Sequence, residues 1–368
     1  MSNTEINKDF EIMIVGGGPA GISSWLHLKK FAPELAAKSI LIEKEKYPRE
    51  KLCGGAIGGW SNKILKQLDV SIDTPSIYID TIECRYKDDI IKIKEPKIFR
   101  IVQRKEFDNA FAKCALNRGL QLNEYETMLN FVRKKDYLLI TTNLFKYKVK
   151  VLIGADGAFS TVRKKMNIKE NTLAPAIEIF EPVNLEYDKE FKEKKVVFDF
   201  SSIDDGLQGY LWHFPCIKNK KPYMNHGIGD FRINKKRPKA NMEKLFIKEL
   251  KKRNIHRNIS TWSGYPIRWL SKFESVVQPN IMLIGDAAGI DPAIGGGIHL
   301  ALSYGEIAAE SIRETYKIND FSFLNYVNKL KSHLVGKYIQ KLTYYANDMY
   351  NQRVNPLTVV EKIFSKKM

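Results

Sequence analysis

The feature that most constrains the fold is a glycine-rich turn at residues 16–21, GGGPAG. It follows four apolar residues, 12–15, which predict a short buried strand, and it precedes an apolar helical pattern over residues 22–31. The three glycines of a G-x-G-x-x-G fingerprint are Gly16, Gly18 and Gly21. In that fingerprint the glycines permit a tight turn, the approach of a pyrophosphate and close packing of helix on strand. A purely structural glycine turn is the alternative interpretation.

An acidic residue follows at the spacing that the fingerprint requires. The apolar residues 39–42 predict a second buried strand, and Glu43 ends it 22 residues after Gly21. An acid about 20 residues beyond the last glycine accepts hydrogen bonds from an adenosine ribose. Strand, turn, helix and strand form one βαβ unit, which predicts a dinucleotide-binding α/β domain. A solvated carboxylate at a strand end is the alternative for Glu43.

Composition narrows the classes of protein that the chain could be. With 368 residues it can form two domains, and its 60 Lys and Arg outnumber 42 Asp and Glu. That basic balance suits an anionic lipid or a phosphorylated substrate, but no nucleic-acid-binding motif is present, so we expect no nucleic acid partner. The four cysteines form no Cys-x-x-Cys pair, so we expect no metal site. A polar N-terminus and the lack of a long apolar run predict a cytoplasmic protein.

Along the chain, short apolar strands that end in an acid and a glycine alternate with longer strand-like segments. Two further apolar strands, at residues 151–154 and 281–284, each run into an acid beside glycine. Residues 174–278 are aromatic-rich and strand-like, with a helix predicted over 242–252, and another helix is predicted from Gly297. We therefore predict a nucleotide-binding domain from residues 1–76, 101–173 and 279–318, a sheet-rich substrate domain from 77–100 and 174–278, and a helical C-terminal region over 319–368.

Six motifs occur in a characteristic order. After the fingerprint with Glu43 come Pro48-Arg49-x-Lys51-x-Cys53-Gly54-Gly55, Arg104 with Asp108, Gly154-Ala155-Asp156-Gly157-x-x-Ser160-x-x-Arg163, Tyr210-x-Trp212-x-Phe214-Pro215 and Gly285-Asp286-Ala287-Ala288-Gly289 with Pro292 and Gly295-x-Gly297. Together they resemble the hydroxylase-type flavoprotein fold and, within it, the geranylgeranyl reductase family, over roughly residues 10 to 315. The resemblance implies an α/β FAD-binding Rossmann-like domain with an inserted antiparallel β-sheet substrate domain and a helical C-terminus.

The same resemblance implies the residues that bind FAD. They are Gly16, Gly18, Ala20, Gly21, Glu43, Lys44, Cys53, Gly54, Arg104, Asp156, Gly157, Asp286, Gly295, Gly297 and Ile298. Arg104 would reach the cofactor from a strand end. The helix that starts at Gly297 would direct its N-terminal N–H groups at the flavin ring and stabilise negative charge there. For Asp108 and Arg163, structural ion pairs are an equal alternative.

Cys53, Tyr210 and Trp212 are the candidate catalytic residues. In the family that the chain resembles, the Cys-Gly-Gly turn lies over the flavin ring, and a thiol there positions substrate or relays a proton. Arg49 and Lys51 are placed to lower its pKa, although a small packed side chain is an equal alternative. Tyr210, Trp212 and Phe214 alternate along one strand and so share a face, which lines the isoprenoid cavity in the family. We interpret His213 and His226, close by, as structural.

The activity implied is FAD-dependent reduction of carbon–carbon double bonds in a polyprenyl lipid or a similarly apolar substrate. The electron donor would be NAD(P)H or a ferredoxin-type protein, and no second dinucleotide fingerprint is evident. The basic surface would favour an anionic lipid, with peripheral contact to a membrane as a further expectation. The alternatives are a flavin-dependent monooxygenase or halogenase, and a non-catalytic flavoprotein that binds lipid or transfers electrons.

Overall fold

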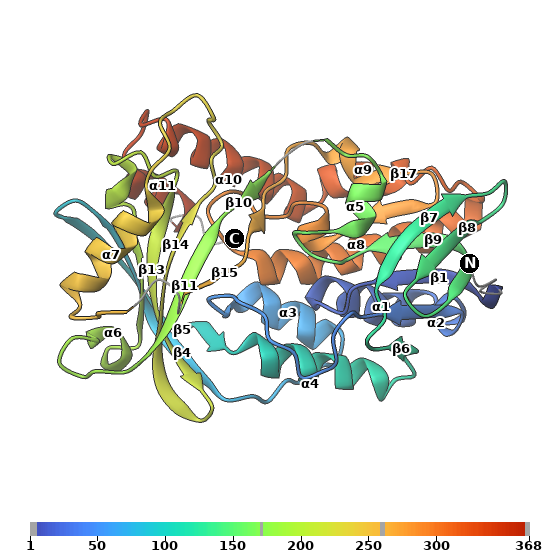
Figure 1. Ribbon diagram of the computed structural model, residues 1–368, viewed down its shortest axis with the longest axis horizontal. Helices are drawn as coiled ribbons and strands as arrows, with labels where there is room; N and C mark the ends of the chain where they lie inside the picture. Colours follow the sequence, from blue (N-terminus) through green and yellow to red (C-terminus); the bar gives the residue numbers. More distant parts are fainter. Residues whose placement is uncertain (1–5, 170–171, 258–261, 365–368) are drawn as a thin grey trace.

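Two eight-stranded sheets, one in each half of the molecule, organise the chain (Figure 1). The structure is a computed structural model that describes residues 6–169, 172–257 and 262–364. The first sheet draws its strands from residues 6–42, 122–154 and 277–283, and the second from 56–102, 176–230 and 263–264. Each sheet is therefore assembled from segments that are far apart in the sequence.

The first sheet is mostly parallel. Its order is β17 (Val277–Gln278), β18 (Ile281–Leu283), β9 (Lys146–Gly154), β1 (Ile6–Val15), β2 (Ser39–Ile42) and β6 (Leu122–Asn123), with β8 (Leu138–Thr142) paired to β9 and β7 (Met128–Arg133) to β8. β18, β9, β1, β2 and β6 run parallel, and residues 12–15 and 39–42 at its centre are buried. Because parallel strands end at one edge, the turns after β1, β2, β9 and β18 gather there.

Helices cover this sheet, and two of them cross at very close range. The helices are α1 (Pro19–Phe31), α2 (Pro33–Ala37), α4 (Arg104–Leu116), α5 (Thr161–Lys165), α8 (Gly297–Ile318) and α9 (Leu324–Ser332). The Ser23 hydroxyl of α1 donates to the Leu302 carbonyl of α8 at 2.7 Å. A Cβ on Gly305 would lie 2.5 Å from the Ser23 oxygen, so this crossing requires a glycine.

The second sheet carries an aromatic face and an aliphatic face. Its order is β15 (Ser263–Gly264), β11 (Ala176–Pro182), β14 (Lys221–Asp230), β13 (Gly209–Lys218), β12 (Lys195–Asp199), β4 (Ser76–Tyr86), β5 (Asp89–Val102) and β3 (Ala56–Gly58). Only β12 and β4 pair in parallel. Phe246 and Leu250 of α7 (Met242–Lys252) pack on the aliphatic face. The helices α10 (Leu334–Tyr350) and α11 (Pro356–Phe364) pack on the aromatic face.

One helix and a short ribbon lie between the halves: α3 (Gly59–Gln67), and the two strands β10 (Leu173–Ala174) and β16 (Ile267–Arg268). The short helix α6 (Lys189–Lys192) packs on β12 and β13 of the second sheet. No helix among residues 6–169, 172–257 and 262–364 is long and apolar enough to cross a membrane.

The predicted fold class is confirmed: an α/β domain carries a second, mainly antiparallel sheet and a helical C-terminal region. The helix predicted over 242–252 and the helix predicted from Gly297 both begin where expected. The expectation that Arg104 lies at a strand end is wrong, because β5 stops at Val102 and Arg104 is the first residue of α4.

Candidate active site

The glycine turn after β1 is held in one shape by contacts that leave no room for side chains. Gly16 has φ +103°, and a Cβ there would lie 2.5 Å from the Ala155 carbonyl oxygen. The Gly17 N–H donates to the Glu43 carboxylate at 2.8 Å, and the Tyr47 hydroxyl donates to the Gly17 carbonyl. The turn thus leads into the N-terminus of α1, where unpaired N–H groups favour an anion.

Glu43 keeps the capacity to accept further hydrogen bonds. Its side chain is 5% exposed and accepts from the N–H groups of Gly17 and Glu45, and Arg49 lies 3.5 Å away. A carboxylate has about four lone-pair sites, so a ribose hydroxyl can still bind. The neighbouring Lys44 is exposed and pairs only weakly with Glu45, at 3.7 Å.

The Gly285-Asp286 segment lies against the first turn of α1. A Cβ on Gly285, whose φ is +60°, would lie 2.7 Å from the Cβ of Ala20. In the described part of the chain no group hydrogen-bonds to the Asp286 carboxylate or pairs with it. Its charge reaches Lys51, whose pKa burial lowers to about 8 in spite of Asp286. The ammonium of Lys51 lies 3.1 Å from the centre of the Tyr265 ring.

Asp156 is engaged within its own loop. Its carboxylate accepts from the Ser160 hydroxyl at 2.5 Å and from the Thr161 N–H at 2.6 Å, at the start of α5. Gly157 follows with φ +78°. Arg163 donates to the Ala287 carbonyl at 3.2 Å, which ties this loop to the Asp286 segment. The acid of this motif therefore shapes the loop beside the glycine turn.

Arg104 lies on a helix and not at a strand end. Its guanidinium donates to both oxygens of Asp108, at 2.7 and 2.8 Å, and this i,i+4 pair forms the first turn of α4. Burial alone would lower the pKa of Arg104, but Asp108 and, less strongly, the neighbouring Cys53 side chain raise it. Arg49 also pairs with Asp108, at 3.3 Å, and with Glu43. The structural ion pair considered for Asp108 is therefore present.

Three predicted parts of the site meet at the aromatic face of the second sheet. A Cβ on Gly54 would lie 2.9 Å from the Phe214 ring and 4.0 Å from the Trp212 indole nitrogen. A Cβ on Gly295 would lie 2.3 Å from the Tyr210 hydroxyl oxygen. The Cys-Gly-Gly turn and the Gly295 loop therefore both pack on the row formed by Tyr210, Trp212 and Phe214, which we call the aromatic row.

The aromatic row depends on a glycine in the neighbouring strand. A Cβ on Gly227 would lie 2.1 Å from the Trp212 ring, so the indole lies directly over that residue. The indole N–H donates to the Asn225 side-chain oxygen at 2.5 Å. Tyr210 and Trp212 are each 8% exposed and share one buried cluster with Phe214, as their alternation predicted.

The two histidines lie on the opposite face of that sheet. The Nδ1 atoms of His213 and His226 are 2.8 Å apart, and His213 Nε2 lies 3.3 Å from the Glu249 carboxylate of α7. Burial lowers the pKa of both rings. Because side chains alternate between faces, neither histidine can reach the aromatic row.

The start of α8 is open where the flavin ring is expected. Gly295 and Gly296 have φ +94° and +108°, and a Cβ on Gly297 would meet no atom within 4 Å. Ile298 is 5% exposed and packs in the core, so it can offer a ligand only its backbone N–H. The glycines leave the N–H groups of this helix end accessible to a negatively charged group.

These observations fit FAD. The N-termini of α1 and α8 both follow glycine turns and have no side-chain cap, and Asp286 offers a carboxylate that no described group hydrogen-bonds. A pyrophosphate, a ribityl chain and an electron-rich ring need groups of these kinds.

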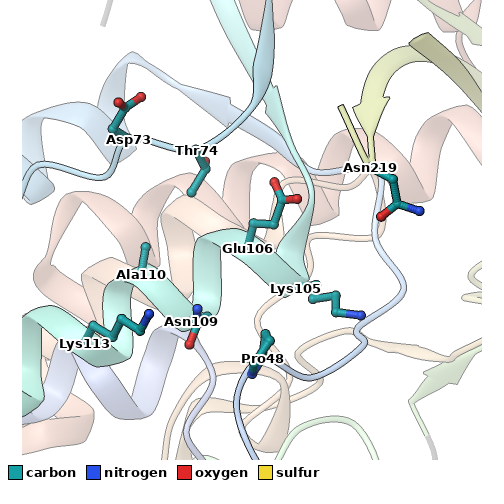
Figure 2. Close-up of a pocket in the computed structure, with 9 residues that line it drawn as sticks. All are labelled: Pro48, Asp73, Thr74, Lys105, Glu106, Asn109, Ala110, Lys113 and Asn219. Atoms are coloured by element: carbon teal, nitrogen blue, oxygen red, sulfur yellow. The ribbon is translucent and has the colours of Figure 1, made fainter. Parts of the chain in front are cut away.

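A separate pocket lies outside this arrangement (Figure 2). It has a volume of about 410 Å³ and is lined by Pro48, Asp73, Thr74, Lys105, Glu106, Asn109, Ala110, Lys113 and Asn219. Seven of its nine lining residues are polar or charged, and none is a predicted site residue.

Sequence analysis missed one residue of this region, Glu178. It lies on β11, is 4% exposed, and accepts a hydrogen bond from the Cys53 N–H at 3.1 Å. The one signal in the sequence is a glutamate between two isoleucines in a strand whose neighbours are apolar.

Comparison with known proteins agrees with the geometry. No protein-family model matches the chain. Digeranylgeranylglycerophospholipid reductase 3 of Methanosphaera stadtmanae is 27% identical over 94% of this chain and 88% of its own length. A geranylgeranyl bacteriochlorophyll reductase-like structure from Thermoplasma acidophilum has a TM-score of 0.74 at 21% identity and covers 98% of this chain and 97% of its own. Halogenase PltM has a TM-score of 0.70 at 15% identity over 93% of this chain and 76% of its own.

The fold is that of hydroxylase-type flavoproteins, and the reductase relatives together with the two glycine-lined helix ends indicate an FAD-dependent oxidoreductase. Within that class, the sequence is similar to digeranylgeranylglycerophospholipid reductases, over 94% of this chain for one of them and 86% for another.

Proposed function

We propose that this oxidoreductase reduces carbon–carbon double bonds of a polyprenyl, geranylgeranyl-type lipid or a similarly apolar compound. The observation that carries the proposal is the contact of the aromatic row with both the Cys-Gly-Gly turn and the Gly295 loop. An apolar surface then borders the expected position of the flavin ring. The names of the related digeranylgeranylglycerophospholipid reductases support the same substrate class.

Each residue has a distinct role in this proposal. When bound, FAD supplies two electrons and one hydrogen as hydride. The start of α1 holds the pyrophosphate, Glu43 the adenosine ribose and Asp286 the ribityl hydroxyls. The start of α8 stabilises negative charge on the ring, and Tyr210 and Trp212 orient the alkene and exclude water.

Cys53 is proposed to position the substrate or relay a proton. Arg49 is not available to the thiol, because Glu43 and Asp108 bind it, so Lys51 and Arg104 are the cations nearby. Replacing Cys53 with serine should slow alkene reduction, whereas Cys114→Ser, at a second half-buried cysteine, should not. Equal rates for both variants would favour a packing role for Cys53.

NAD(P)H or a ferredoxin-type protein is the proposed electron donor, and we propose peripheral contact with an anionic membrane. The formal net charge of +18 favours such a surface. Binding to vesicles with and without anionic lipid tests the second point. Equal binding to both kinds of vesicle would contradict it.

One experiment tests the reaction itself. The holoprotein is reduced anaerobically, and digeranylgeranylglycerophospholipid is added while the flavin absorbance is followed. Reoxidation with formation of a saturated product is the expected result. Reoxidation by oxygen alone, with a hydroxylated or halogenated product, would assign the chain to the monooxygenases or halogenases instead. Tight lipid binding without turnover would indicate a carrier.

A further inference from the structure

Glu178 is a buried acid that has no cationic partner within 4 Å in the described part of the chain. Glu83, Asp108 and Glu249 each pair with an arginine or lysine within 4 Å. The Glu178 carboxylate accepts a hydrogen bond from the Cys53 N–H at 3.1 Å, and the Asn225 side chain is a second hydrogen-bonding neighbour. A buried carboxyl without an ion pair is costly as an anion, so it retains a proton more readily.

The position of Glu178 puts this carboxyl beside the Cys-Gly-Gly turn and on the face of the aromatic row. Glu178 pairs with Gly227 of β14, and Gly227 pairs with Trp212 of β13. Residues directly opposite each other in antiparallel strands share a face, so Glu178 lies on the face of the aromatic row. Its bond to Cys53 joins that face to the Cys-Gly-Gly turn, 125 residues away in the sequence.

The charged and polar groups around Glu178 oppose the effect of burial but do not cancel it. Burial raises the pKa of Glu178, and Asn225 of β14, the Cys53 N–H, Lys51 and Lys218 each lower it. The result is a pKa above the usual value for glutamate. Burial is therefore the main cause of the raised pKa.

We propose that Glu178 is the source of the proton that alkene reduction consumes, and that its bond to Cys53 also holds the Cys-Gly-Gly turn in place. This inference rests on the proposed function. Saturating one double bond adds two electrons and two hydrogens; the hydride brings both electrons and one hydrogen. The proton from Glu178 forms the second C–H bond, which leaves a carboxylate that takes a proton from water before the next turnover.

The test compares Glu178→Gln with Glu126→Gln. Glu126 is an apt control because it is also buried, 1% exposed, and is bound by Thr142 at 2.6 Å without an ion pair. In anaerobic single turnovers with digeranylgeranylglycerophospholipid, we expect the Glu178 variant to be slowed about 100-fold or more, as for loss of a general acid. FAD affinity should stay unchanged. A rate within threefold of wild type would overturn the proton role.

Two readouts do not need turnover. An infrared titration of wild type against Glu178→Gln should give a carboxyl midpoint above that of free glutamate, about 4.3. A midpoint at or below that value would refute the protonated acid. Glu178→Ala should speed alkylation of Cys53 relative to Cys114, measured by mass spectrometry, and an unchanged ratio would refute the positioning role. If wild type reduces no alkene, the proposed function fails, and these two readouts still decide what Glu178 does.

Discussion

Gly227 offers the sharpest test of how the aromatic row is built. A Cβ at this position would lie 2.1 Å from the Trp212 ring, whereas a Cβ on Gly229, two residues along the same strand, would meet that ring at 3.8 Å. Gly227→Ala must therefore displace the indole, and Gly229→Ala need not. Both residues lie on β14 and face the same side, so the two substitutions are closely matched.

The expected difference in the free energy of unfolding between the two variants follows from three contributions. Overpacking a buried position costs about 1–3 kcal/mol. Losing the bond from the indole to Asn225 costs about 1 kcal/mol more. Alanine is favoured over glycine in a strand by about 0.5–1 kcal/mol, and this gain applies to both variants. Gly227→Ala should therefore be less stable than Gly229→Ala by about 2–4 kcal/mol.

Urea unfolding, followed by tryptophan fluorescence and far-ultraviolet circular dichroism, measures this difference. The Gly227→Ala protein should also show altered native fluorescence, because its indole has moved. Free energies of unfolding that agree within about 0.5 kcal/mol would refute the packing of Trp212 on Gly227.

Three more predictions concern the cofactor residues and pH. Asp286→Asn should weaken FAD binding about tenfold, or about 1.4 kcal/mol, in a fluorescence titration, and should change the free energy of unfolding little. Asp156→Asn should instead lower the free energy of unfolding by about 1–2 kcal/mol, because it disturbs the start of α5. Gly295→Ala should destabilise the protein by about 1–3 kcal/mol, since φ is +94° and Tyr210 lies in the way, whereas Gly297→Ala should leave urea unfolding nearly unchanged. Burial lowers the pKa of His27 to about 4, so below pH 6.5 the unfolded chain takes up a proton that the folded chain does not. The free energy of unfolding should therefore fall by at most about 1.4 kcal/mol per pH unit between pH 6.5 and 4. His27→Leu should remove that part of the loss.

Local sequence patterns predicted the cofactor half of the fold well. The strands around residues 12–15 and 39–42 are short apolar runs bounded by glycine or acid. Such runs are typical of buried strands, so the local sequence is enough to predict them. The helix over 242–252 has Asn241 as its N-cap, accepting from the Lys244 N–H, a local signal that the sequence displays.

Contacts between distant segments were not predictable in the same way. Arg104 looked like a strand end because apolar residues precede it, yet its pairing with Asp108 starts a helix there. Glu178 and Cys53 are joined only after two segments fold together, and no spacing rule connects residues that far apart. Gly227 likewise reads as an ordinary glycine until the position of Trp212 is known.

The crossing at Gly305 has a consequence for the geometry of the whole cofactor site. Because α1 and α8 touch there almost backbone to backbone, neither helix can slide along its axis without a clash. One helix begins at the expected pyrophosphate and the other at the expected flavin ring, so this one contact fixes the distance between the sites for those two groups. A side chain at Gly305 would force the helices apart and change that distance, so FAD binding would suffer although no residue that faces the ligand had been replaced.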